Sequence, residues 1–295
     1  MADPAAIAKL VLGTAGLGMP YGLPGADGRP PQPVGEDRAA AVIARAVAIG
    51  IRAFDTAPAY GVAEERLGRY LGPVGTVWTK LAHGQLPTCS LDDSLRRLGR
   101  ARIDLVQWHN WSPGAVAEAD WQALARDPRV GALGCSTYGP DDARAGVACG
   151  RFAVVQVEWN LLDQRVLDAL VDVSGAQPLT VPGRPRTRIA VRSVWLQGVL
   201  HDRLLPAHLA PLGPARERAR RFADGLGLPL PVLALRAALD HPLVHHVLIG
   251  ADHPDQFAVV EAALAAPPLP VEVRARLASL HAASPLTDPR TWSRP

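Results

Sequence analysis

The chain has 295 residues, of which 48% are hydrophobic and 20% are charged, so it can bury a large core and is neither disordered nor fibrous. Its 31 basic and 28 acidic residues leave a net charge of only +3, which predicts that nucleic acid is not a partner. No apolar run reaches the roughly 18 residues that span a bilayer, and no signal-peptide core follows Met1, so we expect a cytoplasmic protein without a membrane contact.

Eight short runs of apolar and β-branched residues, bounded by turn residues, predict strands. They span Ile7–Gly13, Ile51–Thr56, Thr76–Lys80, Ile103–His109, Val130–Cys135, Phe152–Glu158, Ile189–Trp195 and Val244–Gly250. The runs are almost continuously apolar, which is typical of parallel strands buried on both faces.

Helical patterns separate the predicted strands. The clearest spans Glu36–Ile49, where apolar residues recur three and four positions apart and Gly50 follows as a left-handed stop. The others are Val62–Leu71, Leu91–Leu98, Val116–Ala125, Asp141–Ala148, Leu162–Val173, Ala215–Leu226 and Pro254–Ala265. Because parallel strands need crossover helices and eight of them can close, the alternation predicts an α/β fold, a single-domain (β/α)8 TIM barrel over residues 1–295. A doubly wound sheet is the rival, but no G-x-G-x-x-G motif follows the first strand.

Three segments have loop composition. The glycine-rich tract Leu12–Gly22 is either a flexible loop or a place where a ligand approaches the backbone closely. Residues 174–188 carry three arginines and predict a flexible surface loop, with a lid over an anionic group as the alternative. Residues 284–295 are rich in proline and are expected to pack loosely on the barrel.

Polar side chains follow the second, third and fourth predicted strands. Asp55 and Tyr60 follow the second, Lys80 ends the third and His109 ends the fourth. Carboxyl ends of barrel strands meet at one mouth, so these groups can form a proton-transfer unit. A cation such as Lys80 would lower the pKa of Tyr60, Asp55 would hold that cation, and His109 would bind a substrate oxygen. Taken singly, each residue has a structural explanation, but their placement on successive strands favours a common catalytic role.

The stretch Phe-Asp-Thr-Ala-Pro-Ala-Tyr-Gly at residues 54–61, followed by Glu-Glu-Arg-Leu-Gly at residues 64–68, resembles the signature of the aldo-keto reductase family. Lys80 and His109 match the other two members of that family's catalytic tetrad. The resemblance implies a small carbonyl or alcohol substrate and either NADP or NAD as cofactor. It implies that Tyr60 is the general acid in carbonyl reduction and the base in alcohol oxidation. Residues 160–165 and 191–193 resemble bacterial members associated with sugar-like substrates.

The resemblance also assigns residues that hold the nicotinamide end of the cofactor. Ser136 and Gln156 match the residues that bind the carboxamide, whereas Thr137 stands where many relatives have asparagine. Arg192 stands where many relatives have an aromatic residue that stacks on nicotinamide, and Ser193 follows it.

The remaining cofactor positions lie after the seventh and eighth predicted strands. Leu196 and Gly198 belong to a segment similar to the one that passes the pyrophosphate, and Gly250, Asp252 and Gln256 to one similar to the adenosine site. An acidic residue would repel a ribose 2′-phosphate, so we expect Asp252 to make NADH more competitive than is usual in the family.

Alternatives remain at this point. The chain could be a catalytically idle nucleotide-binding barrel with a regulatory role, or a lyase or isomerase that forms a Schiff base through Lys80. Cysteine and histidine spacing predicts no metal site. Four tryptophans lie at or just past predicted strand ends: Trp108, Trp111, Trp159 and Trp195. Packing in the core and stacking on a substrate explain them about equally well. The sequence leaves the oligomeric state open.

Overall fold

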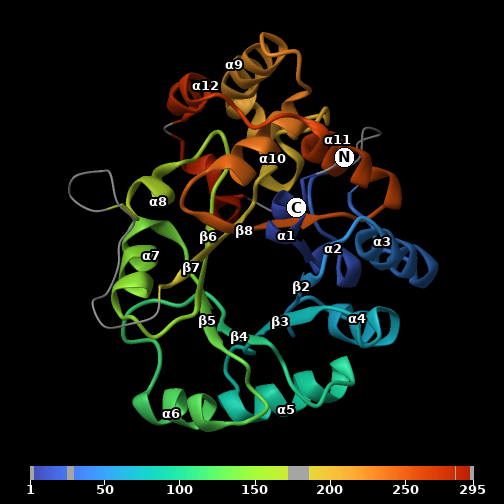
Figure 1. Cartoon of the computed structure of the whole chain (residues 1–295), viewed down its shortest axis with the longest axis vertical. Coiled ribbons are helices and arrows are strands. Elements are labelled where there is room, and N and C mark those ends of the chain that lie inside the picture. The colour runs from blue at the N-terminus through green and yellow to red at the C-terminus, as the bar shows by residue number, and fades with distance from the viewer. Residues whose placement is uncertain (1–2, 25–29, 172–185, 283, 293–295) are drawn as a thin grey trace.

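The computed structural model describes residues 3–24, 30–171, 186–282 and 284–292. Eight parallel strands form a closed barrel in chain order, with the eighth paired to the first. The strands are β1 (Leu10–Gly13), β2 (Ala53–Asp55), β3 (Thr76–Lys80), β4 (Leu105–Trp108), β5 (Leu133–Ser136), β6 (Val154–Glu158), β7 (Arg188–Arg192) and β8 (Val244–Gly250). They ring the centre of Figure 1 with the helices outside them. The predicted (β/α)8 barrel is confirmed, and the doubly wound alternative is wrong.

The strand bounds of β3 and β8 match the prediction, and the other strands are shorter or shifted by a few residues. The start of the first predicted strand is wrong, because the residues before Leu10 form a helix, α1 (Pro4–Lys9). Asp3 caps this helix by accepting a hydrogen bond from the Ala5 amide, and Pro4 occupies the first turn, where no amide donor is needed.

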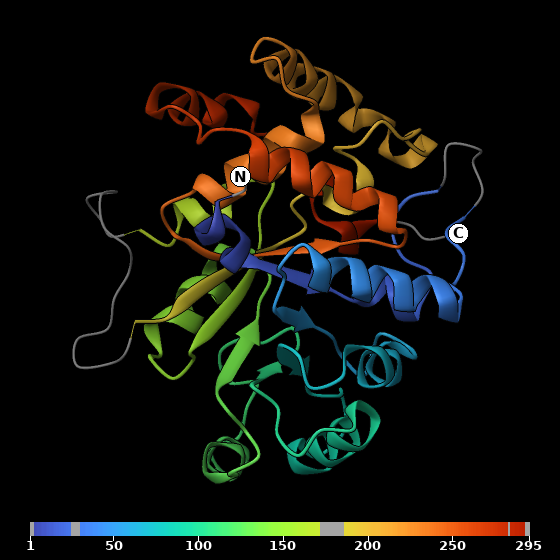
Figure 2. The same cartoon turned by 45° about the vertical axis from the view of Figure 1, so that its right-hand side comes forward.

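Most predicted helices are present within a few residues of their expected bounds. They are α3 (Glu36–Ala48), α4 (Ala63–Leu71), α5 (Pro87–Leu98), α6 (Glu118–Arg126), α7 (Gly139–Ala148), α9 (Gly213–Asp224) and α11 (Phe257–Ala265). Gly50 follows α3 with a φ of 100°, as expected of a left-handed stop. Figures 1 and 2 both show α11 beside α3, so the helix after β8 lies next to the helix after β1 and the outer layer of helices closes.

The helix predicted over Leu162–Val173 is mostly wrong. Within the described residues it is one short turn, α8 (Arg165–Asp168). The Asn160 side chain accepts hydrogen bonds from the Leu162 and Asp163 amides, and the Asn160 and Asp163 backbones pair with each other. These local bonds form a tight turn that competes with a helix.

Among the described residues, three α-helices besides α1 were not predicted: α2 (Ala15–Gly18), α10 (Leu230–Asp240) and α12 (Val271–Arg276). The helix predicted between the last two strands, which is α9, lies outside α10 in Figure 1. The crossover helix that packs on β8 is α10, and its residues are buried on every face from Leu230 to Leu239. A helix that is apolar all round has no amphipathic period to detect.

Two layers of buried side chains stabilise the barrel. A large core lies between the strands and helices. A smaller cluster takes one residue from each of six strands and fills the barrel interior; its members are Val11, Trp78, Leu105, Val154, Ala190 and Leu248. Because the interior is packed, a ligand site can form only at an end of the barrel.

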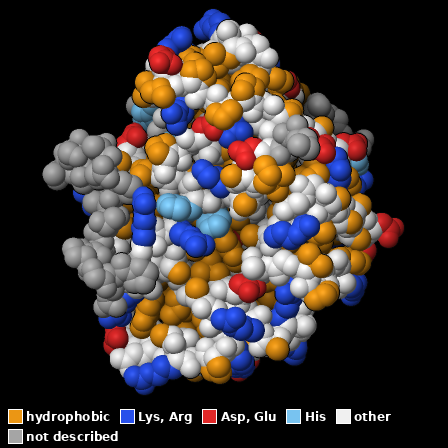
Figure 3. Space-filling model, viewed as in Figure 1, with side chains coloured by type: hydrophobic (Ala, Val, Ile, Leu, Met, Phe, Trp, Pro, Cys, Tyr) orange, Lys and Arg blue, Asp and Glu red, His pale blue; other side chains and the backbone are white. Residues whose placement is uncertain are grey.

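Residues 174–185 of the predicted surface loop lie outside the described residues. The last described segment forms two short 3-10 turns, η5 (Pro285–Thr287) and η6 (Pro289–Thr291). In Figure 3, Lys and Arg side chains are spread over the visible face among hydrophobic and uncharged atoms, in keeping with the small charge excess. No helix in the described parts of the chain is long and apolar enough to cross a membrane.

Candidate active site

A buried ion pair joins the carboxyl ends of β2 and β3. Lys80 Nζ donates to Asp55 Oδ2 at 2.6 Å and to the carbonyl oxygen of Thr56 at 3.0 Å. Both side chains are buried, with 1% of Lys80 and 3% of Asp55 exposed. The carboxylate therefore compensates a charge that water cannot solvate.

The second oxygen of Asp55 is held by two amides. Gln107 on β4 and Gln156 on β6 each donate from Nε2 to Asp55 Oδ1 at 3.0 Å. The β3–β4 register places Gln107 opposite Lys80, which binds the other oxygen of Asp55. Gln107 is fully buried and was missed by the sequence analysis, because a glutamine within an apolar run carries no motif of its own.

Tyr60 lies above this pair, in the loop after β2. The Lys80 ammonium is 5.0 Å from the centre of the Tyr60 ring. Two glycines bring this loop against the loop after β1. A Cβ on Gly18 would collide with the Tyr60 carbonyl oxygen and the Ala63 nitrogen, and Gly61 has a φ of 60° against the Gly18 carbonyl. Close backbone approach therefore explains at least one glycine of the tract at residues 12–22.

Burial and charge set the protonation states of Tyr60 and Lys80. Burial raises the pKa of Tyr60 above its usual value, and Lys80 only partly opposes this shift. The expected net lowering of the Tyr60 pKa by Lys80 is therefore wrong, because burial has the larger effect. Burial alone would lower the pKa of Lys80, but Asp55 and Tyr60 together raise it above its usual value. At neutral pH, Tyr60 is protonated and Lys80 is charged.

His109 completes the group, just past the end of β4. Its ring lies edge-on to the Tyr60 ring, with centroids 6.1 Å apart and an interplanar angle of 88°. Burial lowers the pKa of His109 to about 3, and the positive charges of Lys80 and Arg192 add to this effect. The imidazole is therefore neutral at physiological pH and carries one N–H donor.

Two adjoining cavities open at this end of the barrel. The tetrad cavity, of about 420 Å³, is lined by Asp55, Tyr60 and His109 among others, while Lys80 lies beneath its floor. The side cavity, of about 220 Å³, extends over the ends of β7 and β8. The two share lining residues and form one continuous depression; the shared residues are Tyr21, Ser193, Gln197, Leu248 and Gly250.

The residues assigned to the nicotinamide end surround the tetrad cavity. Ser136 and Gln156 are opposite each other in the β5–β6 register and both line the cavity, with Ser136 Oγ 3.5 Å from Gln156 Oε1. Thr137 is buried behind the wall and does not line it. Arg192 lines the cavity and donates to the Thr137 carbonyl oxygen at 2.8 Å.

The segment after β7 is an unusual turn. Ser193, Leu196 and Gln197 have φ values of 63°, 47° and 52°, in the left-handed region that non-glycine residues rarely adopt. The Gln197 carbonyl accepts a hydrogen bond from the Leu23 amide at 3.1 Å, which ties the loop after β1 to this turn. Ser193 and Gly198 line the side cavity, whereas Leu196 is buried beneath it.

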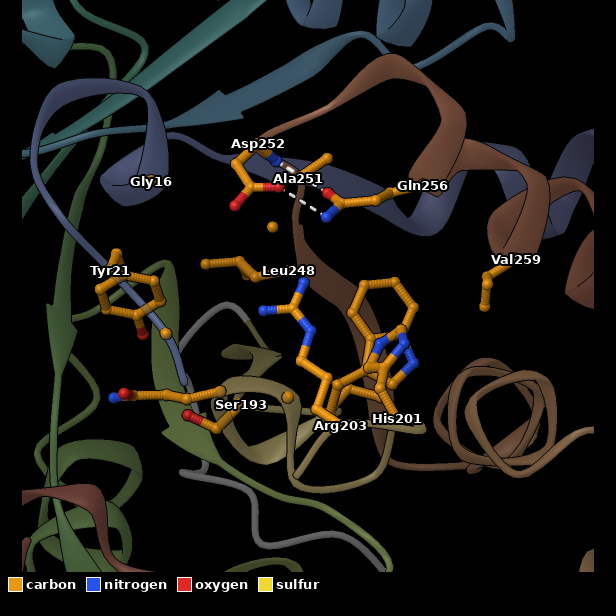
Figure 4. A pocket seen from close by; sticks show the side chains of 16 residues that line it. Gly16, Tyr21, Ser193, His201, Arg203, Leu248, Ala251, Asp252, Gln256 and Val259 are labelled. Atoms are coloured by element: carbon orange, nitrogen blue, oxygen red, sulfur yellow. Dashed lines mark hydrogen bonds between the residues drawn. The ribbon is translucent and has the colours of Figure 1, made fainter. Parts of the chain in front are cut away.

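The far end of the side cavity follows β8. Gln256 Nε2 donates to Asp252 Oδ1 at 2.5 Å, and Gln256 Oε1 accepts from the Asp252 amide at 2.8 Å. Figure 4 shows this pair at one edge of the cavity and Arg203 within it. Gly250 has no atom within 4 Å of an added Cβ, so the backbone here is open to a ligand.

Several lining residues escaped the sequence analysis, namely Tyr21, Tyr138, His201, Arg203, Arg290 and Trp292. They lie in loops without periodic pattern, so only their position after a strand could have suggested them. Core packing explains three of the four tryptophans at the predicted strand ends. Trp108, Trp111 and Trp159 are buried in the core and line neither cavity, while Trp195 lines the side cavity.

Comparison with solved structures supports the same fold. An aldo-keto reductase from Bacillus halodurans, in its holo form, matches with a TM-score of 0.72 and 23% identity, over 94% of this chain and 93% of that one. A glycerol dehydrogenase from Gluconobacter oxydans matches with a TM-score of 0.67 and 23% identity, over 92% and 90% of the two chains. At these identities the matches show that the barrel fold is shared with bacterial enzymes.

The family model described as the aldo/keto reductase family matches residues 9–176, which is more than half of the chain. The matched region runs from the start of β1 past β6 and contains Asp55, Tyr60, Lys80 and His109. The chain therefore belongs to the aldo/keto reductase family of oxidoreductases, which act on carbonyl compounds.

Proposed function

We propose that this protein reduces an aldehyde or ketone to an alcohol, or catalyses the reverse oxidation, with Tyr60 as the general acid or base. The observation that carries the proposal is the buried pair of Asp55 and Lys80 beneath Tyr60, in a cavity that also exposes His109. This arrangement fits proton transfer, which needs neither a nucleophile nor a metal ion.

The protonation states favour a defined role for each side chain. Tyr60 is protonated and donates its proton to the carbonyl oxygen of the substrate. The charged Lys80 then stabilises the phenolate that remains, and Asp55 keeps Lys80 charged. Neutral His109 donates its N–H to the same oxygen and orients the carbonyl group.

The depression fits a dinucleotide that lies across the ends of β7 and β8. NAD(P)H, when bound, supplies the hydride that goes to the carbonyl carbon. Ser136 and Gln156 would hold the nicotinamide end beside Tyr60, with Arg192 on the wall of the same cavity and Thr137 buried behind that wall. The turn Ser193–Gly198, including Leu196, would pass the pyrophosphate. The open backbone at Gly250 leaves room for the adenosine end.

Asp252 sets the expected cofactor preference. Gln256 holds one of its carboxylate oxygens, so the side chain is fixed at the edge of the side cavity. A fixed carboxylate accepts hydrogen bonds from ribose hydroxyl groups and repels a 2′-phosphate. We therefore expect NADH to bind more tightly than NADPH. Arg203 lies within the same cavity and would help to neutralise the pyrophosphate.

The decisive experiment is a comparison of wild type with Tyr60→Phe. NADH and NADPH affinities are measured by quenching of tryptophan fluorescence, and turnover is followed with aldoses, keto sugars and aromatic aldehydes. We expect the variant to keep wild-type cofactor affinity and to lose at least about a thousandfold in kcat. Wild-type turnover by the variant would refute the mechanism, and tighter binding of NADPH than NADH would refute the role of Asp252.

The same experiment separates the two alternatives. A regulatory barrel would bind cofactor without turning over any carbonyl compound. A Schiff-base enzyme would work without nicotinamide and would form a borohydride-trapped adduct at Lys80. The raised pKa of Lys80 disfavours that chemistry, because the protonated amine is not a nucleophile.

A further inference from the structure

The C-terminal segment forms one wall of the tetrad cavity. Pro289, Arg290 and Trp292 line this cavity together with Tyr60 and His109, although they are about two hundred residues away in sequence. The barrel strands supply the reacting groups, so this wall faces whatever part of the substrate lies away from the carbonyl group.

The segment is held in place by the turn after β6. Thr287 is buried, and its hydroxyl donates to Asp163 Oδ2 at 2.8 Å. The amide of Ala282 donates to the Leu162 carbonyl at 2.9 Å, and Gln164 Nε2 donates to the Leu277 carbonyl at 2.8 Å. The same turn that shortens α8 therefore docks the chain end, which fixes Arg290 at the cavity.

Two guanidinium groups stack on one ring in this wall. The Arg192 guanidinium carbon is 4.1 Å and the Arg290 guanidinium carbon 3.7 Å from the centre of the Tyr138 ring. Each cation has a carboxylate partner: Glu158 at 3.4 Å from Arg192 and Asp288 at 2.6 Å from Arg290. Stacking and pairing together hold two like charges at one site.

Both arginines line the cavity, and each has N–H groups that no acceptor in the described parts of the chain uses. Neither carboxylate partner lines the cavity, whereas both arginines do. Among the described residues, the side-chain hydrogen bonds of Arg192 use Nη2 alone and those of Arg290 use Nε and Nη2. Nε and Nη1 of Arg192 and Nη1 of Arg290 therefore remain available to an acceptor in the cavity. Planar donors arranged in this way suit a carboxylate or phosphate oxyanion.

We propose that Arg192 and Arg290, stacked on Tyr138, form a subsite for an oxyanion carried by the carbonyl substrate. The preferred substrates are then acidic aldehydes or ketones, in which the oxyanion lies at the arginine wall and the carbonyl group at Tyr60. This inference rests on the proposed carbonyl reduction and adds the charge of the substrate to it.

The test compares matched substrates that differ in one negative charge. para-Carboxybenzaldehyde is paired with its methyl ester, and glyceraldehyde phosphate with glyceraldehyde. The variant is Arg290→Gln, which keeps a polar side chain at the mouth. The control is Arg96→Gln, since Arg96 is an exposed residue of α5 that is paired with Asp93 and lines neither cavity. NADH affinity is measured for each protein by fluorescence quenching.

We expect wild type to favour at least one charged substrate by kcat/KM, and Arg290→Gln to lose about fivefold or more of that preference. The estimate is modest because the Arg290 side chain is 53% exposed and water screens it. Turnover of the neutral substrates and NADH affinity stay unchanged, and Arg96→Gln behaves as wild type. A preference in the benzaldehyde pair alone identifies the oxyanion as a carboxylate, and a preference in the glyceraldehyde pair alone identifies it as a phosphate.

Two results would overturn the subsite: equal use of charged and neutral substrates in both pairs, or a preference that survives in Arg290→Gln. Either leaves carbonyl reduction intact. A binding measurement tests the subsite even if the protein reduces no aldehyde. The ligand is para-(hydroxymethyl)benzoate, and its binding to the NADH complex is measured by fluorescence. If no aldehyde turns over but Arg290→Gln weakens this binding, the oxyanion site stands and the proposed reduction falls.

Discussion

Removing both partners of the Asp55–Lys80 pair should destabilise the fold far less than the sum of the two single removals. The pair is 2.6 Å apart and almost fully buried, and an unpaired buried charge costs about 3–5 kcal/mol. For Lys80→Met we expect a loss of about 3 kcal/mol, because Gln107 and Gln156 still donate to Asp55. For Asp55→Asn we expect about 4–5 kcal/mol, because the buried ammonium then has only neutral acceptors such as the Thr56 carbonyl.

The double variant tests the argument. With both charges gone, no buried charge is left unpaired, and lost packing and hydrogen bonds should cost about 2–3 kcal/mol instead of the summed value of about 7–8 kcal/mol. Urea unfolding at pH 7, followed by circular dichroism, gives the free energy of unfolding of wild type and the three variants. The slope of this free energy against urea concentration should not differ among the four proteins. If the double variant loses as much free energy of unfolding as the two single variants together, Asp55 and Lys80 stabilise the barrel separately and are not coupled as a pair.

Two further predictions concern the loop of Tyr60 and the buried histidines. Gly18→Ala should force the Tyr60 loop away from α2 and reduce kcat at least tenfold, while a circular dichroism spectrum like that of wild type shows that the barrel is intact; an unaltered kcat would contradict the close contact. The pKa is about 3 for His109 and about 4 for His201, His241 and His246, chiefly through burial, against 6.5 in the unfolded chain. Below pH 6.5 the unfolded chain therefore binds protons that the folded chain excludes, so stability falls between pH 6.5 and 4 by at most about 1.4 kcal/mol per pH unit for each histidine. Urea unfolding at pH 7 and pH 5 should show a clear loss at pH 5, and equal stability at the two values would mean that these histidines are accessible to protons.

The barrel was predictable because its strands are short, apolar and separated by helices of regular period. The prediction failed where local chemistry opposed the pattern. Asp3 and Pro4 begin a helix where the apolar run suggested a strand, and Asn160 closes a turn where a helix was expected. The helix α10 escaped because burial on every face removes the periodic signal.

The candidate site was predictable where it follows strand order and unpredictable where it depends on distant segments. Asp55, Lys80 and His109 end successive strands, so their meeting follows from topology alone. Arg290 reaches the same cavity because its segment docks on the turn after β6, in part through Thr287 and Asp163, and a hydroxyl–carboxylate contact between residues this far apart leaves no pattern in a single sequence.

The hydrogen bonds beneath the cavity limit how substitutions can be interpreted. Gln156 donates to Asp55 Oδ1 and also lies 3.5 Å from the Ser136 hydroxyl, so it contacts both the ion pair and a residue assigned to the cofactor. Loss of activity in Gln156→Leu would therefore not by itself identify a cofactor contact. A cofactor role alone would weaken NADH binding and leave the pH dependence of kcat unchanged, whereas a role through Asp55 would shift that dependence, because Lys80 would lose a well-held partner. Gln107 probes the ion pair more directly, since it donates to Asp55 at the same distance and lines neither cavity; its Oε1 also accepts from Gln156 at 3.4 Å, so NADH affinity is measured for a Gln107 variant as well.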